Sequence, residues 1–261
     1  MANSKYENVK LTEILMKNGM KCHTYITQPE GEHKDGSLPV VFFMIDAIGL
    51  RARLYEMADH IASKGYYVIA PNMFYRKGFP VVPNLERLLQ PEKLGEIFCQ
   101  LNCLAGSVNR DEALSDITEF FDYVKQQKQC RPLTEKGAGF VGYCFGGYIS
   151  TVFAEEFPEK IAAVASYHAG MLASDKPTSP HLAVDKIKCE IYFGHADNDD
   201  SMNAEAIKTL DSACEKAKIK YTSEVYKGCA HGFNMSDTLM WNEQGCARHW
   251  ETLFDLFKRN L

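Results

Sequence analysis

The sequence lacks the features that mark several protein classes. Its nine cysteines are an odd number and contain no CxxC pair, so we expect neither a disulfide framework nor a zinc site. Lysine and arginine number 29 against 34 aspartates and glutamates, and this acidic balance disfavours nucleic acid as a partner. With only 18 glycines and 10 prolines in 261 residues, a collagen-like or linker-dominated chain is excluded.

Signals for targeting and for membrane insertion are also missing. Residues 1–10 are polar and lack the apolar core of a secretory signal peptide. The most apolar stretch, Pro39–Ile45, is far too short to cross a bilayer. We therefore expect a cytoplasmic protein with reduced thiols and no membrane partner. The sequence does not distinguish a monomer from a homodimer.

What the sequence does contain is a regular alternation of strand and helix signals. The strand signals are short apolar or alternating runs, at residues 40–45, 67–70, 139–143, 161–166, 189–193 and 221–226. Their alternation with helical patterns predicts a single α/β domain over residues 1–261, with a mainly parallel central sheet and helices on both faces. At one edge, Asn18-Gly19 between residues 10–16 and 20–26 predicts an antiparallel hairpin.

One connection, residues 72–108, is too long for an ordinary loop. It contains prolines at positions 80, 83 and 91 and a short apolar helix, whose residues Cys99 and Cys103 are expected to pack in the core. A connection of this length inside a compact domain is usually functional, so we expect it to form the wall of a pocket or a lid.

The most specific motif is Gly142-Tyr143-Cys144-Phe145-Gly146-Gly147, placed between a predicted strand and a predicted helix. It has the pattern of a nucleophile elbow, G-x-Nuc-x-G, with cysteine as the nucleophile. The sharp turn leaves no room for side chains two residues before and after the nucleophile, and glycine occupies both positions. The following helix N-terminus favours a thiolate at Cys144.

A nucleophile of this kind needs a base and an acid that orients the base. In the order expected for this elbow, the acid follows the nucleophile and the histidine comes last. Asp197 lies just past the predicted strand 189–193, and Asp199 is an alternative to it. His231 lies between the last strand and the last helix, so we predict Cys144, Asp197 and His231 as the catalytic triad.

When such a nucleophile attacks a carbonyl group, the oxyanion that forms needs two backbone N–H donors. The first is the N–H of Phe145, the residue after the nucleophile. The second is expected from Ala47, in the loop after the first long parallel strand.

Other reactive side chains near the strand ends have simpler explanations. His168 and His195 are expected to be supporting or structural residues. Cys229 lies two residues before His231, and we expect it to be a small buried residue.

These motifs resemble those of the dienelactone hydrolase family of α/β-hydrolases. The similarity covers essentially the whole chain and includes Ala70–Asn72, Gly142–Gly147, Phe193–Asp197 and His231–Phe233. The resemblance implies the α/β-hydrolase fold and a cysteine-dependent hydrolase that uses the triad named above.

The resemblance also implies roles for residues outside the triad. The family has a glutamate after the first long strand that interacts with the thiol and tunes its ionisation, and Asp46 occupies that position here. The family's arginine for a substrate carboxylate matches Arg76. Its neighbour Tyr75 would line an aromatic pocket at the substrate site or belong to the core.

Together these expectations describe a hydrolase of ester or lactone bonds in small molecules that forms an acyl-thioenzyme. No metal or organic cofactor is expected, and the expected partner is the small-molecule ester or lactone itself. Two alternatives stay open: a thioesterase or acyl-transfer enzyme on the same triad, and a non-catalytic scaffold that binds a small molecule.

Overall fold

A computed structural model describes residues 6, 9–80, 82 and 85–261 of the chain. Most of the polar amino-terminal segment, at residues 1–5, 7 and 8, lies outside the described residues, and so does Pro83. The chain divides into two compact units, Met1–Pro132 and Leu133–Leu261. The single domain expected over residues 1–261 stays a prediction.

The described residues of the first unit form four strands, in the order β1-β2-β4-β3. Their bounds are β1 (Thr12–Leu15), β2 (Lys21–Thr27), β3 (Val40–Met44) and β4 (Tyr67–Pro71). The predicted hairpin is confirmed, since β1 pairs antiparallel with β2 around a turn in which Gly19 has a φ of 81°. β2 pairs antiparallel with β4, whereas β3 and β4 are parallel. Both strands of the parallel pair are buried along their whole length, as their apolar runs predict.

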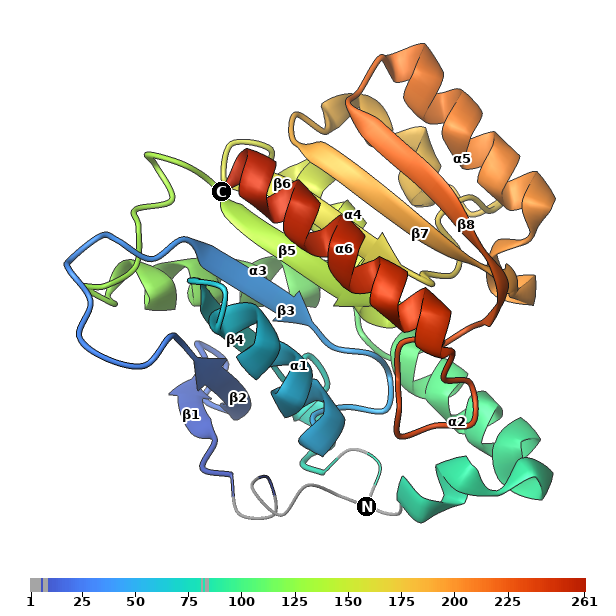
Figure 1. Ribbon diagram of the computed structural model, residues 1–261, viewed down its shortest axis with the longest axis horizontal. Helices are drawn as coiled ribbons and strands as arrows, with labels where there is room; N and C mark the ends of the chain where they lie inside the picture. Colours follow the sequence, from blue (N-terminus) through green and yellow to red (C-terminus); the bar gives the residue numbers. More distant parts are fainter. Residues whose placement is uncertain (1–5, 7–8, 81, 83–84) are drawn as a thin grey trace. The chain divides into compact units, whose positions relative to one another are not determined.

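Two helices of the first unit cover opposite faces of these strands (Figure 1). α1 (Ala52–Ala62) packs on β4 and β2. α3 (Arg110–Lys125) packs on β3, where the rings of Phe42 and Phe121 meet edge to face with centroids 5.4 Å apart. The side chain of Asn109 accepts the N–H of Asp111 at 2.8 Å and caps the start of α3.

The connection over residues 72–108 carries short helices. They are η2 (Tyr75–Lys77), η3 (Leu85–Leu89), η4 (Pro91–Lys93) and α2 (Leu94–Gly106). Cys99 and Cys103 are exposed on α2, so the expected core packing of these two thiols is wrong. The apolar face of α2 that is buried carries Ile97 and Leu101 instead.

The second unit contains four parallel strands, in the order β5-β6-β7-β8. Their bounds are β5 (Ala138–Tyr143), β6 (Ile161–Tyr167), β7 (Glu190–Asn198) and β8 (Tyr221–Ala230). The strands are where the sequence predicts them, but β7 and β8 continue past their predicted ends at Phe193 and Tyr226. The carboxyl ends of parallel strands meet at one edge of a sheet, so the residues that follow these strands belong to one neighbourhood.

Helices cover both faces of this second sheet, as predicted (Figure 1). α4 (Phe145–Glu156) packs on β5 and β6, and α6 (Glu243–Asn260) crosses the strands on the other face. α5 (Ala204–Ala217) joins β7 to β8, with η7 (Asp200–Met202) before it; η5 (Pro180–Leu182) and η6 (Val184–Lys186) lie between β6 and β7. Close packing of α4 requires Gly147, because a Cβ there would lie 2.7 Å from Ser166 Oγ.

Candidate active site

Cys144 lies in the turn between β5 and α4, as the elbow motif predicts. Its φ of 55° and ψ of −118° are in a region that residues with a side chain rarely adopt. The turn is fixed from two sides: Cys144 N–H donates to Tyr167 O at 3.1 Å, and Cys144 O accepts the N–H of Gly147 at 3.0 Å. The thiol is half-buried. This backbone conformation, held by the neighbouring strand and helix, is the kind of local strain found at functional sites.

The elbow has no room for a side chain at Gly142. A Cβ there would overlap the carbonyl of Gly146 and would lie 2.6 Å from the N of Gly147. Both atoms belong to the backbone of the first turn of α4, so the obstacle cannot rotate away as a side chain would. The glycine at this position is therefore a steric requirement of the elbow.

Replacing Gly142 with alanine is expected to lower the free energy of unfolding by about 3 kcal/mol or more, because the new methyl group must displace backbone. The matched control is Gly95→Ala on α2, where a Cβ meets no atom within 4 Å. There the change should be small, up to about 1 kcal/mol, and stabilising. Urea unfolding followed by circular dichroism measures both. A Gly142→Ala protein as stable as the wild type would contradict the steric explanation.

His231 follows β8 and is hydrogen-bonded on both sides. Its Nδ1 lies 2.6 Å from Oδ2 of Asp199, and the ring also hydrogen-bonds the sulfur of Cys144. Because Nδ1 is taken by the carboxylate, the nitrogen that faces the sulfur is Nε2. The structure thus joins thiol, imidazole and carboxylate in series at the ends of β5, β8 and β7.

The charges around His231 favour its protonated form. Burial alone acts to lower the pKa of His231, but the charge of Cys144 and the hydrogen bond to Asp199 outweigh it and raise this pKa well above its ordinary value. Burial acts to raise the pKa of Asp199, and the hydrogen bonds from His231 and Ser201 outweigh it, so this pKa is lowered. These two shifts favour an imidazolium at His231 beside an ionised Asp199.

Asp197 does not bind His231, contrary to the prediction. It lies within β7, at a position where the register between β7 and β8 shifts. Its Oδ2 accepts the N–H of Gly228 at 3.0 Å, so the carboxylate satisfies a backbone donor in the irregular part of β8. Asp199 is the first residue after β7 and takes the place beside the imidazole. β7 is longer than its apolar run indicates. Asp197 therefore lies inside the strand, and Asp199 takes the position at its end that was predicted for Asp197.

Asp46, in the first unit, forms a buried ion pair with Arg51. The two guanidinium nitrogens of Arg51 lie 2.8 and 2.9 Å from the two carboxylate oxygens, and both side chains are almost fully buried. Asp46 also accepts the N–H of Ile48 at 3.1 Å. The carboxylate thus orders the loop after β3, which contains Ala47. Thiol tuning by Asp46 and oxyanion binding by Ala47 stay predictions, while Phe145 opens α4 and contributes one of its first-turn N–H groups.

Arg76 is engaged by a carboxylate of its own unit. Its Nη1 and Nη2 donate to the two oxygens of buried Asp116 at 2.6 and 2.9 Å. The hydroxyl of Tyr75 donates to the same carboxylate at 3.0 Å and accepts from Asn18 at 2.8 Å. The bidentate fork that was expected to bind a substrate carboxylate is filled by Asp116. Tyr75 is buried in this cluster, which agrees with the core alternative for that side chain.

Two ion-pair partners, Arg51 of Asp46 and Asp116 of Arg76, are not predicted from the sequence. Arg51 is five residues from Asp46, and this short spacing just before a helix is a sequence signal from which the pair could be predicted. Asp116 lies 40 residues after Arg76 on a helix whose apolar face is buried, and nothing in the local sequence marks it as a partner.

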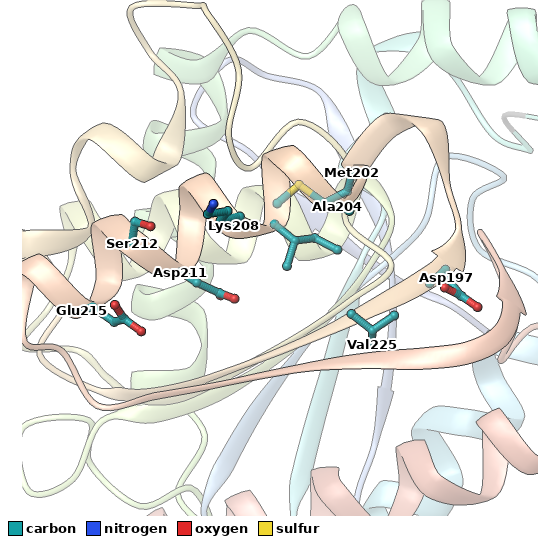
Figure 2. A pocket seen from close by; sticks show the side chains of 10 residues that line it. Asp197, Met202, Ala204, Lys208, Asp211, Ser212, Glu215 and Val225 are labelled. Carbon is teal, nitrogen blue, oxygen red and sulfur yellow. The ribbon is translucent and has the colours of Figure 1, made fainter.

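A pocket of about 500 Å³ lies on the second unit beside α5. Figure 2 shows Lys208, Asp211 and Glu215 on the helix and Asp197 and Val225 on the two strands. Of the described residues that line it, none belongs to the Cys144–His231–Asp199 series. Cys144 is therefore not part of the lining of this pocket.

Among residues 6, 9–80, 82 and 85–261, no group of three or more His, Cys, Asp or Glu side chains is placed to hold a metal ion. Over the same residues, no helix combines the length and the apolar character needed to cross a bilayer.

Comparison with known proteins identifies the family of the chain. The model of the dienelactone hydrolase family matches residues 22–261. The chain belongs to the dienelactone hydrolase family. It is a dienelactone hydrolase-like hydrolase, and the family prediction made from the motifs is confirmed.

Relatives of this dienelactone hydrolase family member are distant in sequence but cover nearly all of it. A protein of Escherichia coli (strain K12) named "Putative carboxymethylenebutenolidase" is 26% identical over 245 residues, which are 92% of this chain and 83% of the relative. One of the same name from Synechocystis is 25% identical and covers 97% of this chain and 98% of the relative.

Solved structures confirm the predicted fold. The crystal structure titled putative dienelactone hydrolase from Klebsiella pneumoniae has a TM-score of 0.79 and 19% sequence identity, with 95% of this chain and 97% of that chain covered. A dienelactone hydrolase-like promiscuous phosphotriesterase, P91, has a TM-score of 0.69 at 18% identity and covers 97% of both chains. The chain therefore has the α/β fold of the dienelactone hydrolases.

Proposed function

We propose that this hydrolase cleaves ester or lactone bonds of small molecules through an acyl-thioenzyme on Cys144. The observation that carries the proposal is the series Cys144–His231–Asp199 at three strand ends of the second unit. The raised pKa of His231 supports an imidazolium that stabilises the thiolate of Cys144. A half-buried thiolate in a strained elbow is a suitable nucleophile for a carbonyl carbon.

The reaction would proceed in two halves. The sulfur of Cys144 attacks the carbonyl carbon, and the carbonyl oxygen becomes an oxyanion that accepts the N–H of Phe145. One such donor stabilises the transition state by about 3 kcal/mol. The tetrahedral intermediate expels the alkoxide, which takes the proton from Nε2 of His231 and leaves a thioester on Cys144. The neutral imidazole then accepts a proton from water, the hydroxide attacks the thioester, and the acid is released with the thiolate restored.

The substrate class rests on the relatives and on the first unit. The name carboxymethylenebutenolidase, carried by several relatives, favours a lactone among the substrates. Recognition of a carboxylate by Arg76 has less support, because Asp116 already occupies both arms of the guanidinium. We therefore propose a lactone or ester whose binding does not depend on Arg76.

Trapping the acylated protein tests the proposal. Cys99 and Cys103 are exposed and would react non-specifically, so the experiment uses a Cys99→Ser/Cys103→Ser background. After a rapid acid quench during turnover of p-nitrophenyl acetate, peptide mass spectrometry should find the acetyl group on Cys144, released by hydroxylamine as a thioester is. Turnover with the acetyl group on another side chain, or with none on Cys144, would overturn the proposed nucleophile.

The bond that is cleaved can be established with matched substrates. Initial rates on an unsaturated five-membered lactone, an aryl ester and a thioester with the same acyl group separate a lactone or ester hydrolase from a thioesterase. We expect the lactone and the aryl ester to give the higher kcat/KM. A preference for the thioester would favour the acyl-transfer alternative, and binding without turnover of any of the three would favour a non-catalytic scaffold.

A further inference from the structure

His168 is a buried histidine that the mechanism above does not use. It follows β6 directly, at the same edge of the sheet as Cys144, Asp199 and His231, and only 1% of it is exposed. Its backbone has a φ of 38°, in the left-handed region, and its N–H donates to Gly194 O at 2.7 Å. The chain thus holds this residue in a strained conformation at the end of the strand next to the nucleophile's strand.

The ring of His168 contacts the ring of His231. Their centroids are 4.9 Å apart and the rings are inclined by 64°, so the edge of one meets the face of the other. The ring centroid of His168 is also 5.5 Å from that of Phe233 and 6.1 Å from that of Tyr143. His168 therefore fills the space between the core of the unit and the imidazole that faces the thiol.

Hydrogen bonding identifies the tautomer of His168. Its Nε2 lies 2.8 Å from Oδ1 of Asn234, and because a side-chain carbonyl oxygen can only accept, the proton is on Nε2. Nδ1 is buried and has no hydrogen-bond partner among the described residues. Nε2 is therefore the ring nitrogen that anchors His168.

We propose that His168 is a positioning residue for His231, an inference that rests on the proposed function of the Cys144–His231–Asp199 series. His231 must keep Nδ1 on the carboxylate and Nε2 toward the sulfur, and a rotation of its ring breaks both bonds. The ring of His168 against it opposes that rotation. The bond to Asn234 fixes His168 in turn and joins it to the loop that carries His231, three residues before Asn234.

The charge state of His168 suits this role. Burial, and then the charge of His231, lower the pKa of His168 to about 3, while Asn234 and Asp199 oppose the shift. His168 is therefore neutral near pH 7. A neutral ring does not compete with His231 for the carboxylate of Asp199.

Two substitutions separate positioning from simple core packing. His168→Ala removes the ring, whereas His168→Phe keeps a ring against His231 and loses only the bond to Asn234. Leu253→Val, in the buried face of α6, is a control for a loss of stability alone. The readouts are kcat and KM on p-nitrophenyl acetate, the pH profile of kcat, and the low-field proton NMR signal of the His231 Nδ1–H in the resting protein.

We expect His168→Ala to lower kcat roughly 10²-fold with KM changed less than about threefold, because a misplaced base slows the chemical steps. The low-field signal should be lost in His168→Ala and retained in His168→Phe, which should keep kcat within about tenfold of wild type. In Leu253→Val, both kcat and the signal should be unchanged.

Two results would overturn the inference. One is a folded His168→Ala protein that retains kcat and the low-field signal. The other is a decrease in kcat that is proportional to the decrease in stability in His168→Ala, His168→Phe and Leu253→Val alike, with no change in the pH profile of kcat. The NMR signal needs no substrate, so it tests His168 even where the acyl group is not found on Cys144. Conversely, an acylated Cys144 with an unchanged signal in His168→Ala rejects the positioning role alone.

Discussion

Replacing Cys144 with alanine is expected to reduce kcat on p-nitrophenyl acetate on the order of 10⁴-fold or more. The substitution removes the atom that forms the acyl intermediate, and the activity left comes only from substrate binding and oxyanion stabilisation. Cys144 is the half-buried thiol that hydrogen-bonds His231, and alanine leaves the glycines of the elbow unchanged. The protein should therefore fold as the wild type does. Steady-state kinetics on the purified variant, with an unfolding curve, measures both expectations.

Cys229 provides the matched control for this substitution. It is a buried cysteine two residues before His231, and its sulfur lies toward Gly245 of α6. Cys229→Ala should lower stability moderately and leave kcat within a few-fold of wild type, because its thiol has no place in the series. Equal losses of kcat in Cys144→Ala and Cys229→Ala would contradict the assignment. So would a Cys144→Ala protein that keeps a tenth of the activity.

Cys144→Ala is also expected to change the pKa of His231. The charge of Cys144 is a major contribution to the raised pKa of His231, opposing the effect of burial. Without it, the pKa of His231 should fall, so the imidazolium form should be lost at a lower pH than in the wild type. A titration of the imidazole carbon-bound protons by NMR measures the change. An unchanged pKa would mean that the thiol and the imidazole are not coupled.

The parts of the fold that the sequence predicts are those set by local patterns. Strands β3, β4 and β5 are buried on both faces, so their residues are apolar without interruption, and such runs need no knowledge of their neighbours. The elbow is equally local, because the steric requirement at Gly142 concerns atoms only four and five residues away. For this reason the strand–Cys144–helix unit was predictable in detail.

The choice between the two acids was not local. Asp197 and Asp199 follow the same apolar run, and either one could lie past the strand on sequence grounds. The end of β7 is set by its pairing with β8, about 30 residues later, and by the register shift at Asp197. The partner of Asp197 is an N–H of that distant strand, at Gly228. The pairing of β7 with β8 decides which carboxylate is free to bind the imidazole. This long-range pairing cannot be read from a single sequence.

The partner of Arg76 was unpredictable for a related reason. A bidentate guanidinium fits a substrate carboxylate and an aspartate equally well, so residue type alone does not tell the two apart. The packing of α3 brings Asp116 to Arg76, and the turn after β3 brings Arg51 to Asp46. The Arg76–Asp116 pair depends on helix packing that periodicity predicts only in outline.

Replacing Asp199 with asparagine is expected to lower kcat on the order of 10³-fold, while Asp197→Asn changes it less than about threefold. Asparagine keeps the size of the side chain and one oxygen but loses the charge that stabilises the imidazolium. Its amide can also donate to Nδ1 and so turn the imidazole into the wrong tautomer. Asp197→Asn keeps an oxygen for the N–H of Gly228 and does not contact His231. The two variants are matched in chemistry and lie two residues apart.

The pH dependence gives the pair of variants a second, independent readout. Asp199 helps to raise the pKa of His231 against the effect of burial, so Asp199→Asn should lower this pKa. The imidazolium partner of the thiolate is then lost at a lower pH, and the alkaline limb of the kcat/KM profile should move to lower pH. In Asp197→Asn the limb should stay where it is in the wild type. A large loss in Asp197→Asn with an unchanged limb in Asp199→Asn would return the acid's role to Asp197, and with it a geometry in which β7 ends earlier than the structure has it.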